Sequence, residues 1–590
     1  MTILRSMQMR SMALMLAAMT AVPVFARAEN DADRVPADAV AYVHWEGEDA
    51  LGGQYAASHM KGLLDALNLR ETLTALMDKR MAKLEGPQKD KAQFMKDFLH
   101  TAVKYPTSVY VGTVDLSNPD KPLPTIAIFS KMGAANAGEY ADKLNSIAAD
   151  TKDKSVPFSI SAVGDYLLVT IGADTDMAKR LATVPPTDGL GSTEDFNKTM
   201  MQFGAGAVEA PAIVYINGEA ALHVIDDLVA SKGRGAQGWP AAEMALGLTE
   251  IKQIAWAGNF DGPEWVGQLF IGMGPNRTGL LDFLDNKPLS DDALKQIPAN
   301  ATWAGAFAFD GSRFLDDMRN AAGQIDPRGQ QNFDFGLRQF FAFTGVDIKK
   351  DLLASLGTEF TYFAFPDAAG KSADNLVMAT KLKNPQKMDT ALNTLENTIN
   401  ALIMQRDSNS SVQFKTEALD APDDKITAHI LTLPLASPAW AIQGDVLYVG
   451  ISKSAVQHAI DNGATAGSIT ANPTFAALRK KLGNQQMSGF GYLDLPKVAP
   501  EDYDTIKELL AEWSVPYTLP PLAALTPHLT PYLKVSWTDA AGFHVKSLGA
   551  FPFSGDVLSP YQVTVQKLRL EAMHERRHPA EAPATQEKLP

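Results

Sequence analysis

The chain contains VPADAVAYVHW at residues 35–45 and a similar stretch, IPANATWAGAF, at residues 297–307. In both, a turn-forming Pro-Ala pair with Asp or Asn precedes a run of β-branched, aromatic and small residues, the pattern of a short β-strand. Two more pairs follow in the same order: GDYLLVTI (164–171) with GDVLYVGI (444–451), and YIN (215–217) with YLD (492–494). The three pairs occur in the same order, and the two members of each pair are about 260 to 280 residues apart. This arrangement predicts that one unit occurs twice in tandem.

The first predicted unit combines an amphipathic helix with a hairpin. Its apolar residues recur at i, i+3, i+4 and i+7 over residues 60–67, which predicts a helix with one buried face. The β-rich run 109–114 is joined by a loop of turn-forming residues to a second run at 126–129. That order predicts an antiparallel pair of strands.

The second predicted unit has the same style. Apolar residues recur at helical spacing over residues 392–399, and the β-rich runs 360–365 and 376–379 form another predicted hairpin. Strands joined by hairpins, with helices inserted between the pairs, predict an α+β fold rather than the strict βαβ alternation of a doubly wound sheet. The sequence therefore predicts two tandem similar α+β units.

The predicted organisation has four segments. A polar stretch with a proline and an Asp-Asp pair, residues 285–296, marks the join between the two units. Beyond residue 560 a charged helical pattern leads into a tail rich in Pro, Ala and Glu, which predicts disorder. The expected boundaries are 1–28 for a signal peptide, 29–290 and 291–560 for the two α+β repeats, and 561–590 for the charged helix and disordered tail.

Composition excludes several classes of protein. The 590 residues include no cysteine, which excludes disulfide frameworks, Cys-ligated zinc, iron–sulfur centres and thiol catalysis. With 46% hydrophobic and 21% charged residues the chain has the composition of a folded globular protein. The 53 basic and 68 acidic residues give a net charge of −15, which argues against nucleic acid as a partner.

The N-terminal segment has the features of an export signal. Two arginines precede an apolar stretch at residues 12–25, and Ala26 and Ala28 supply the small residues that a signal peptidase requires. The apolar stretch is shorter than the ~20 residues of a membrane-spanning helix. We therefore expect cleavage after Ala28, no transmembrane span in the mature chain, and a periplasmic or secreted location.

The signal peptide, the Pro-Ala-Asp opening at residues 36–38 and the Gly-Asp turn before an apolar strand and helix together resemble a family of proteins. This family consists of exported bacterial proteins catalogued only as a domain of unknown function. The resemblance implies a fold style and an exported location. It implies no functional residue, because the shared motifs are structural.

One motif has the form of a metal site. His574, Glu575 and His578 form an H-E-x-x-H string, in which two histidines on one helical face can bind zinc while the glutamate activates a water. The context opposes this reading: Pro579 ends any helix at once, and two arginines between the histidines repel a cation. The competing interpretation is a solvated helix end.

Two further strings match catalytic or binding patterns by letter only. Residues 233–238 read G-x-G-x-x-G, but they follow a helical pattern, whereas a dinucleotide site follows a strand and opens a helix. We interpret them as a connector. Residues 58–61 read S-x-x-K without the partner motifs of a serine acyl-enzyme, so this match is interpreted as accidental.

These observations favour binding over catalysis. No cofactor and no catalytic residue is expected, and the expected function is that of an exported, envelope-associated binding protein. Its partner would be an envelope protein, a polymer or an apolar ligand held between the two units, where two-domain proteins often bind ligands. The alternatives are a zinc-dependent hydrolase that uses the C-terminal H-E-x-x-H string, and a structural or assembly factor of the cell envelope.

Overall fold

We describe the protein from a computed structural model. The description covers residues 31–559 and 565–566, except for residues 69–70, 73, 75–76, 79–80, 83–84, 87–88, 90–91, 94–95, 97–102, 118–121, 150–156, 173–175, 184–187, 205–206, 208–209, 232, 234–237, 276, 286, 368–371, 409, 421–425, 434–436, 466, 484–485 and 514–516.

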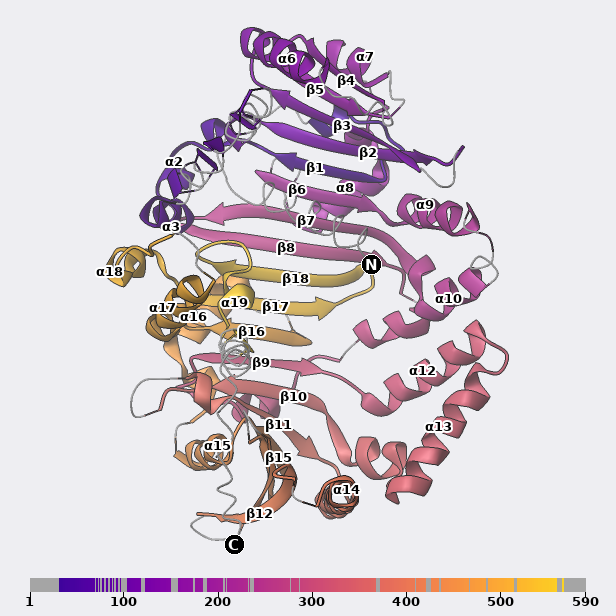
Figure 1. The fold of residues 1–590 in the computed structure, drawn as a ribbon, viewed down its shortest axis with the longest axis vertical. Helices are drawn as coiled ribbons and strands as arrows, with labels where there is room; N and C mark the ends of the chain where they lie inside the picture. Colours follow the sequence, from indigo (N-terminus) through magenta and orange to yellow (C-terminus); the bar gives the residue numbers. More distant parts are fainter. Residues whose placement is uncertain are drawn as a thin grey trace, which may run out of the picture.

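All the β-strands of the described residues belong to one antiparallel sheet of eighteen strands (Figure 1). The strands before residue 276 are β1 (Ala41–Trp45), β2 (Thr107–Asp115), β3 (Leu123–Lys131), β4 (Phe158–Val163), β5 (Tyr166–Ile171), β6 (Ala212–Asn217), β7 (Ile251–Asp261) and β8 (Glu264–Met273). The later strands are β9 (Trp303–Ala308), β10 (Leu356–Ala364), β11 (Val377–Leu382), β12 (Gln413–Leu419), β13 (Ile426–Thr432), β14 (Ala439–Gln443), β15 (Val446–Gly450), β16 (Gly489–Leu493), β17 (Tyr532–Thr538) and β18 (Gly542–Gly549).

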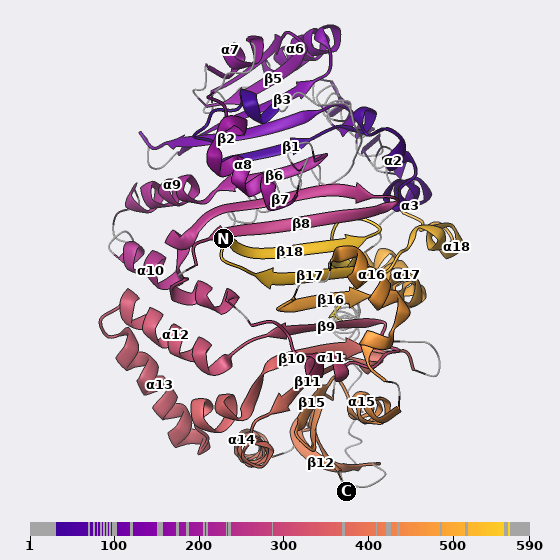
Figure 2. The ribbon, with the colours of Figure 1, turned by 180° about the vertical axis from the view of Figure 1, so that it is seen from behind.

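Strand pairing gives the order in which these strands lie across the sheet. The first eight strands lie in the order β4-β5-β3-β2-β1-β6-β7-β8. The sheet continues from β8 as β18-β17-β16-β9-β10-β11-β15-β14-β13-β12. One long sheet thus runs through both predicted units, and β8 and β18 join them at its centre (Figures 1 and 2).

Helices lie between the strands along the chain. Those before β9 are α2 (Gly52–Ala56), α3 (His59–Leu67), α6 (Ala134–Ala149), α7 (Asp176–Ala182), α8 (Glu194–Met201), α9 (Gly218–Ser231), α10 (Trp239–Leu246) and α11 (Asp291–Lys295). The later ones are α12 (Gly311–Ile325), α13 (Gly329–Thr344), α14 (Pro385–Arg406), α15 (Lys453–Thr465), α16 (Pro473–Leu482), α17 (Leu495–Glu512), α18 (Leu522–Leu525) and α19 (Ser554–Val557). None of the described helices is both long and apolar enough to cross a membrane. The sequence prediction of a mixed α+β protein with antiparallel strands is confirmed.

The predicted hairpins and helices are present. The pair β2–β3 contains the runs predicted at residues 109–114 and 126–129, and β10–β11 contains those at 360–365 and 376–379 except for residues 365 and 376, which lie just outside the strands. Helix α3 contains the apolar pattern of residues 60–67, and α14 contains that of residues 392–399. The spacing of apolar residues was sufficient to predict these hairpins and helices, because each is formed by residues that are close in the chain.

Both Gly-Asp dipeptides form two-residue hairpin turns. Gly164 lies between β4 and β5 with φ of 57°, and Gly444 lies between β14 and β15 with φ of 59°. These values are in the left-handed region, where any residue with a Cβ is strained. The geometry of a two-residue turn explains why glycine is the first residue of both turns.

Gly164→Ala and Gly444→Ala are each expected to destabilise the protein by about 1 to 2 kcal/mol, the cost of a Cβ at positive φ. Gly138→Ala in α6 is the matched control, because a Cβ there meets nothing within 4 Å and alanine favours the helix. Urea unfolding of the three variants measures the effect. Equal midpoints for all three would contradict the account of the turns.

The hydrophobic core has one large cluster on each side of the β8–β18 junction. One is built from the strands β1–β3 and β5–β7 and the helices beside them, with Tyr42, Phe129, Phe196 and Tyr215 among its buried residues. The other is built mainly from β9 to β18 with their helices. A smaller cluster crosses the junction: Leu63 of α3 packs with Leu525 of α18 and Ala550, which follows β18. The two parts of the sheet therefore share buried apolar contacts as well as a strand pair.

Candidate functional site

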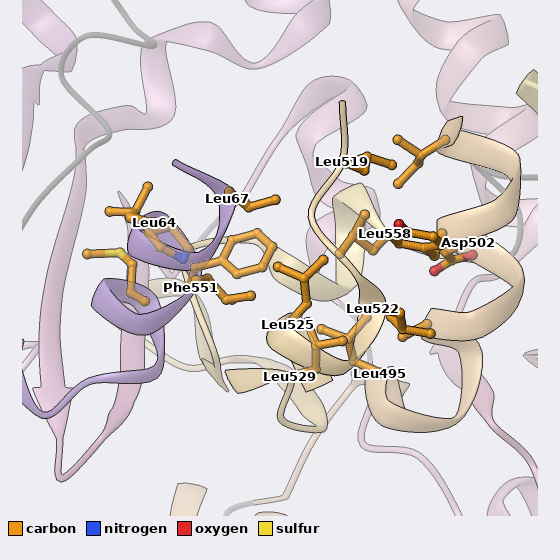
Figure 3. A pocket seen from close by; sticks show the side chains of 16 residues that line it. Leu64, Leu67, Leu495, Asp502, Leu519, Leu522, Leu525, Leu529, Phe551 and Leu558 are labelled. Carbon is orange, nitrogen blue, oxygen red and sulfur yellow. The ribbon is translucent and has the colours of Figure 1, made fainter. Parts of the chain in front are cut away.

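An apolar pocket lies where α3 meets α17 and α18, at one end of the strands β8 and β18 (Figure 3). Helix α3 comes from the first part of the chain, and the other two helices come from the last part, so the two parts share the pocket. Its volume is about 460 Å³, within the range of about 300 to 1,000 Å³ typical of small-molecule sites. The described lining residues are Met60, Leu63, Leu64, Leu67, Leu495, Ala499, Asp502, Tyr503, Ile506, Leu519, Leu522, Leu525, Leu529, Phe551, Pro552 and Leu558.

Helix α3 begins at a fixed point against the sheet. Ser58 caps it, since its hydroxyl accepts a hydrogen bond from the Lys61 N–H at 3.1 Å, and the His59 N–H donates to the Pro263 carbonyl at 2.9 Å. Met60 and Leu63 are buried, whereas Leu64 and Leu67 are only half-buried. The apolar face predicted from the sequence is therefore partly core and partly the wall of a cavity.

A glycine allows the two parts of the chain to approach closely beside the pocket. Gly62 of α3 lies against His528, and a Cβ at Gly62 would come within 2.2 Å of the His528 ring. The His59 and His528 rings lie edge to face with their centroids 6.3 Å apart. Burial lowers the pKa of His59, the nearby Glu264 carboxylate raises it and His528 lowers it further, with the net effect a lowering. The lowered pKa therefore favours the neutral form of the His59 ring.

Two tyrosine hydroxyls hold the segment that closes the pocket. The Tyr517 hydroxyl donates to the Leu67 carbonyl at 2.6 Å, which ties the end of α3 to the chain before α18. The Tyr503 hydroxyl donates to the Pro520 carbonyl at 2.9 Å. At the junction itself, Lys481 forms an ion pair with Glu264 at 2.5 Å. These contacts keep the walls from the two parts of the chain together around the cavity.

Asp502 is the one ionisable carboxyl among the lining residues. It lies on α17, is 4% exposed, and its Oδ2 has no hydrogen-bond partner among the described residues. Burial, and then the negative charge of Glu501, raise the pKa of Asp502 to about 8. The carboxyl is therefore mostly protonated at neutral pH, which makes it a hydrogen-bond donor.

Asp502 was not predicted as a site residue from the sequence, although the residue pattern of α17 indicates that it is unusual. Leu495, Ala499, Asp502 and Ile506 follow the spacing of one helical face, and three of these four residues are apolar. A single acidic residue on an otherwise apolar face is rarely buried without a reason. The anomaly could have been found from the pattern alone.

Several sequence-predicted sites lie outside the described residues. These are Ala26 and Ala28 of the signal peptide and the H-E-x-x-H residues His574, Glu575 and His578. Within the part of the chain that the structure describes, no group of three or more His, Asp or Glu side chains is arranged to hold a metal ion.

The remaining motif strings have structural roles. Ser58 of the S-x-x-K string is the N-cap of α3, while the Lys61 ammonium pairs with Asp65 instead of the serine. Gly233 and Gly238 of the G-x-G-x-x-G string lie between α9 and α10, after a helix rather than after a strand. Both interpretations made from the sequence agree with these positions.

A buried polar network in the first part of the sheet has the residue types of a catalytic triad. Ser108 Oγ lies 2.9 Å from His44 Nδ1, and His44 Nε2 lies 3.1 Å from Glu46 Oε2. Ser108 also donates to Asp31 at 3.0 Å and is 0% exposed. A serine with no access to substrate cannot act as a nucleophile, so the network satisfies buried polar groups instead.

A second buried network lies under α14. Glu396 accepts hydrogen bonds from His429 Nδ1 at 2.7 Å and from Trp440 Nε1 at 2.5 Å. The His429 and Trp440 rings are stacked, with their centroids 3.8 Å apart. All three side chains are at least nine-tenths buried, and none of them lines the apolar pocket or the cavity beside α9. The network therefore stabilises the fold.

Glu396→Ala is expected to lower the free energy of unfolding by about 2 to 5 kcal/mol, because it leaves two buried donors without an acceptor. Glu396→Gln keeps one acceptor oxygen and is expected to lose less. Urea unfolding of the two variants beside Glu417→Ala, which removes the half-exposed ion pairs with Lys415 and Lys453, measures the difference. A loss from Glu396→Ala no larger than that from Glu417→Ala would contradict the role of the network.

A second cavity, of about 360 Å³, lies between α9, the strand β2 and the chain just before β1. Its walls mix apolar side chains with polar ones, the latter including Asp38, Asn217, Glu219, His223 and Asp227. Glu219 is already paired with Lys252 at 2.7 Å. The apolar pocket is the stronger candidate because its lining is uniform and contains an unpaired buried group.

Comparisons with known proteins give a family match over part of the chain. Residues 276–521 match the model of a family described as "Protein of unknown function (DUF3352)", in agreement with the resemblance to an uncharacterised family. The matched range contains the IPAN opening at residues 297–300 and all of α17, but not α3 or α18. The comparison with curated proteins gave no match.

Two solved structures of one protein are also similar to this chain. "Structure of crystal form III of TP0453" is 12% identical, with 44% of this chain and 79% of that chain covered. "Structure of crystal form I of TP0453" is 11% identical, with 48% and 99% covered. The TM-score is 0.21 in both cases. Function must therefore be inferred from this chain's own residues.

Proposed function

We propose that the protein is an exported, non-catalytic binding protein of the cell envelope that holds an apolar ligand between its two halves. The observation that carries this proposal is the cavity of about 460 Å³, lined by leucines and other apolar residues contributed by α3 on one side and by α17 and α18 on the other. An apolar cavity of this size buries a small ligand and gains about 25 cal/mol for each Å² of apolar surface removed from water.

The two halves are proposed to be copies of one unit. Support comes from the order of pairing: β4-β5-β3-β2-β1-β6-β7-β8 corresponds strand by strand to β14-β15-β11-β10-β9-β16-β17-β18. Isolated bridges also correspond, between Pro36 and Gly189 and between Pro298 and Ser468. The pair β12–β13 is an addition to the second copy. In this view β8 and β18 are equivalent edge strands that pair with each other, and the pocket forms beside that junction.

Export is proposed from the N-terminal sequence, with cleavage after Ala28 and a periplasmic or secreted location. The net charge of −15 agrees with a partner other than nucleic acid. The ligand would then be an apolar component of the envelope.

Binding of N-phenyl-1-naphthylamine, a neutral apolar fluorophore, tests the proposal. We expect a saturable rise in fluorescence with one site per chain. In Ala499→Phe an aromatic ring enters the cavity from α17, and we expect the affinity to fall at least about tenfold.

Ala523→Phe is the matched control, because Ala523 is an exposed residue of α18 and does not line the pocket. It makes the same change outside the cavity and is expected to bind the fluorophore like the unmodified protein. Circular dichroism checks that both variants are folded. The proposal fails if the folded protein does not bind the fluorophore, or if Ala499→Phe binds it as tightly as Ala523→Phe.

A further inference from the structure

Asp502 is an anomaly that the apolar character of the pocket does not explain. A buried carboxyl without a partner costs free energy, and buried polar atoms in native proteins nearly always have one. The Oδ2 atom of Asp502 has none among the described residues, although the side chain is 4% exposed and lines the cavity. An apolar residue at this position would pack the same wall without that cost.

The surroundings of Asp502 limit what it can bind. No lysine, arginine or histidine lines the described pocket, so an anionic group that entered it would have no opposite charge nearby. The Tyr503 hydroxyl donates its proton to the Pro520 carbonyl, which leaves the Asp502 carboxyl as the polar donor facing the cavity. A buried ammonium would have Asp502 as its one opposite charge among the lining residues, and burying that pair would cost both groups their hydration.

We propose that Asp502 binds the polar end of the ligand, and that this ligand is a neutral lipid, a long-chain alcohol or its ester. The protonated carboxyl donates to the hydroxyl or carbonyl oxygen of such a ligand, and its carbonyl oxygen accepts from a ligand hydroxyl. The apolar chain then extends from Asp502 on α17 toward Leu64 and Leu67 of α3, which lie across the pocket (Figure 3). This assignment rests on the proposed function and adds to it the class of ligand and the residue that selects it.

Displacement of N-phenyl-1-naphthylamine by three ligands of equal chain length tests the assignment at pH 7. The ligands are lauryl alcohol, laurate and laurylamine. For the unmodified protein we expect lauryl alcohol to bind at least about tenfold more tightly than laurate or laurylamine. In Asp502→Leu we expect that preference to fall about tenfold, while the fluorophore itself still binds. Asp502→Asn keeps a neutral hydrogen-bonding group and is expected to remain within about threefold of the unmodified protein.

Asp504→Asn is the control, because Asp504 is an exposed acid on the same helix. It is expected to leave all three affinities unchanged. If the fluorophore does not bind the unmodified protein, the proposed function itself fails. If the fluorophore binds but Asp502→Leu keeps the preference for the alcohol, or the unmodified protein prefers laurate or laurylamine, the role of Asp502 is overturned.

Discussion

Val545→Pro is expected to lower the stability of the whole protein by at least about 3 kcal/mol and to uncouple its two halves. Val545 lies in β18, opposite Ser536 of β17 on one side and Leu269 of β8 on the other. In a strand with neighbours on both sides every N–H bonds to one of them, so proline removes a ladder hydrogen bond and leaves a buried carbonyl unpaired. The substitution disrupts β8–β18, the one strand pair of the described residues that joins the two parts of the sheet.

The uncoupling has a specific signature in hydrogen exchange. In the unmodified protein we expect peptides from β1–β8 and from β9–β18 to lose protection at the same urea concentration, since the strand pair and the pocket link them. In Val545→Pro we expect the two sets to lose protection at different concentrations. Fluorophore binding should fall in parallel, because each half supplies one wall of the pocket.

Ala162→Pro is the matched control for this change. Ala162 is an exposed residue of β4, which pairs with β5 alone and forms one edge of the sheet. Residues that flank a two-residue turn form a hydrogen-bonded pair, and Ala162 is one residue removed from that pair, so its N–H points away from β5. An unfolding midpoint for Val545→Pro equal to that of Ala162→Pro would show that the β8–β18 pair does not couple the halves.

Features fixed by neighbouring residues were predictable from the sequence. The Gly-Asp dipeptides predicted turns because a two-residue hairpin requires a positive φ, which Gly164 and Gly444 adopt. The apolar spacing of residues 60–67 predicted a helix because its period matches 3.6 residues per turn. Each of these predictions depended on a few residues that are close in the chain.

The junction of the two halves was not predictable in the same way. Leu269 and Val545 face each other in a sheet, yet each lies in an ordinary apolar strand that also has a partner nearby in sequence. Alternation of residues indicates that a strand is half-buried but does not say which distant strand it meets. The pocket was equally hidden, because a face that lines a cavity has the same residues as a face that packs in a core.

Asp502 is expected to make the protein less stable as the pH rises from about 5 to 8.5. Burial and the Glu501 charge raise the pKa of Asp502 from 3.8 to about 8 in the folded chain. Because this value is above that of the unfolded chain, the folded state binds the proton more tightly. Its stabilisation is complete below about pH 4 and is lost as the pH rises through about 8, a loss of about 2 to 5 kcal/mol.

Asp502→Asn isolates this contribution, since the amide has similar size and does not ionise. We expect its free energy of unfolding, measured in urea, to change less between pH 5 and pH 8.5 than that of the unmodified protein, by about 2 kcal/mol or more. Asp504→Asn, an exposed change on the same helix, should keep the pH dependence of the unmodified protein. If Asp502→Asn keeps it as well, the carboxyl is not held neutral by the pocket.

The same comparison bears on why the carboxyl is there. Asp502→Leu removes the unpaired group, so at pH 8.5 it is expected to unfold at a higher urea concentration than the unmodified protein. A natural residue that lowers stability within a binding cavity is typical of a site where function opposes stability. Greater stability of Asp502→Leu, with loss of preference for a neutral lipid, is the combined result expected if Asp502 serves the ligand rather than the fold.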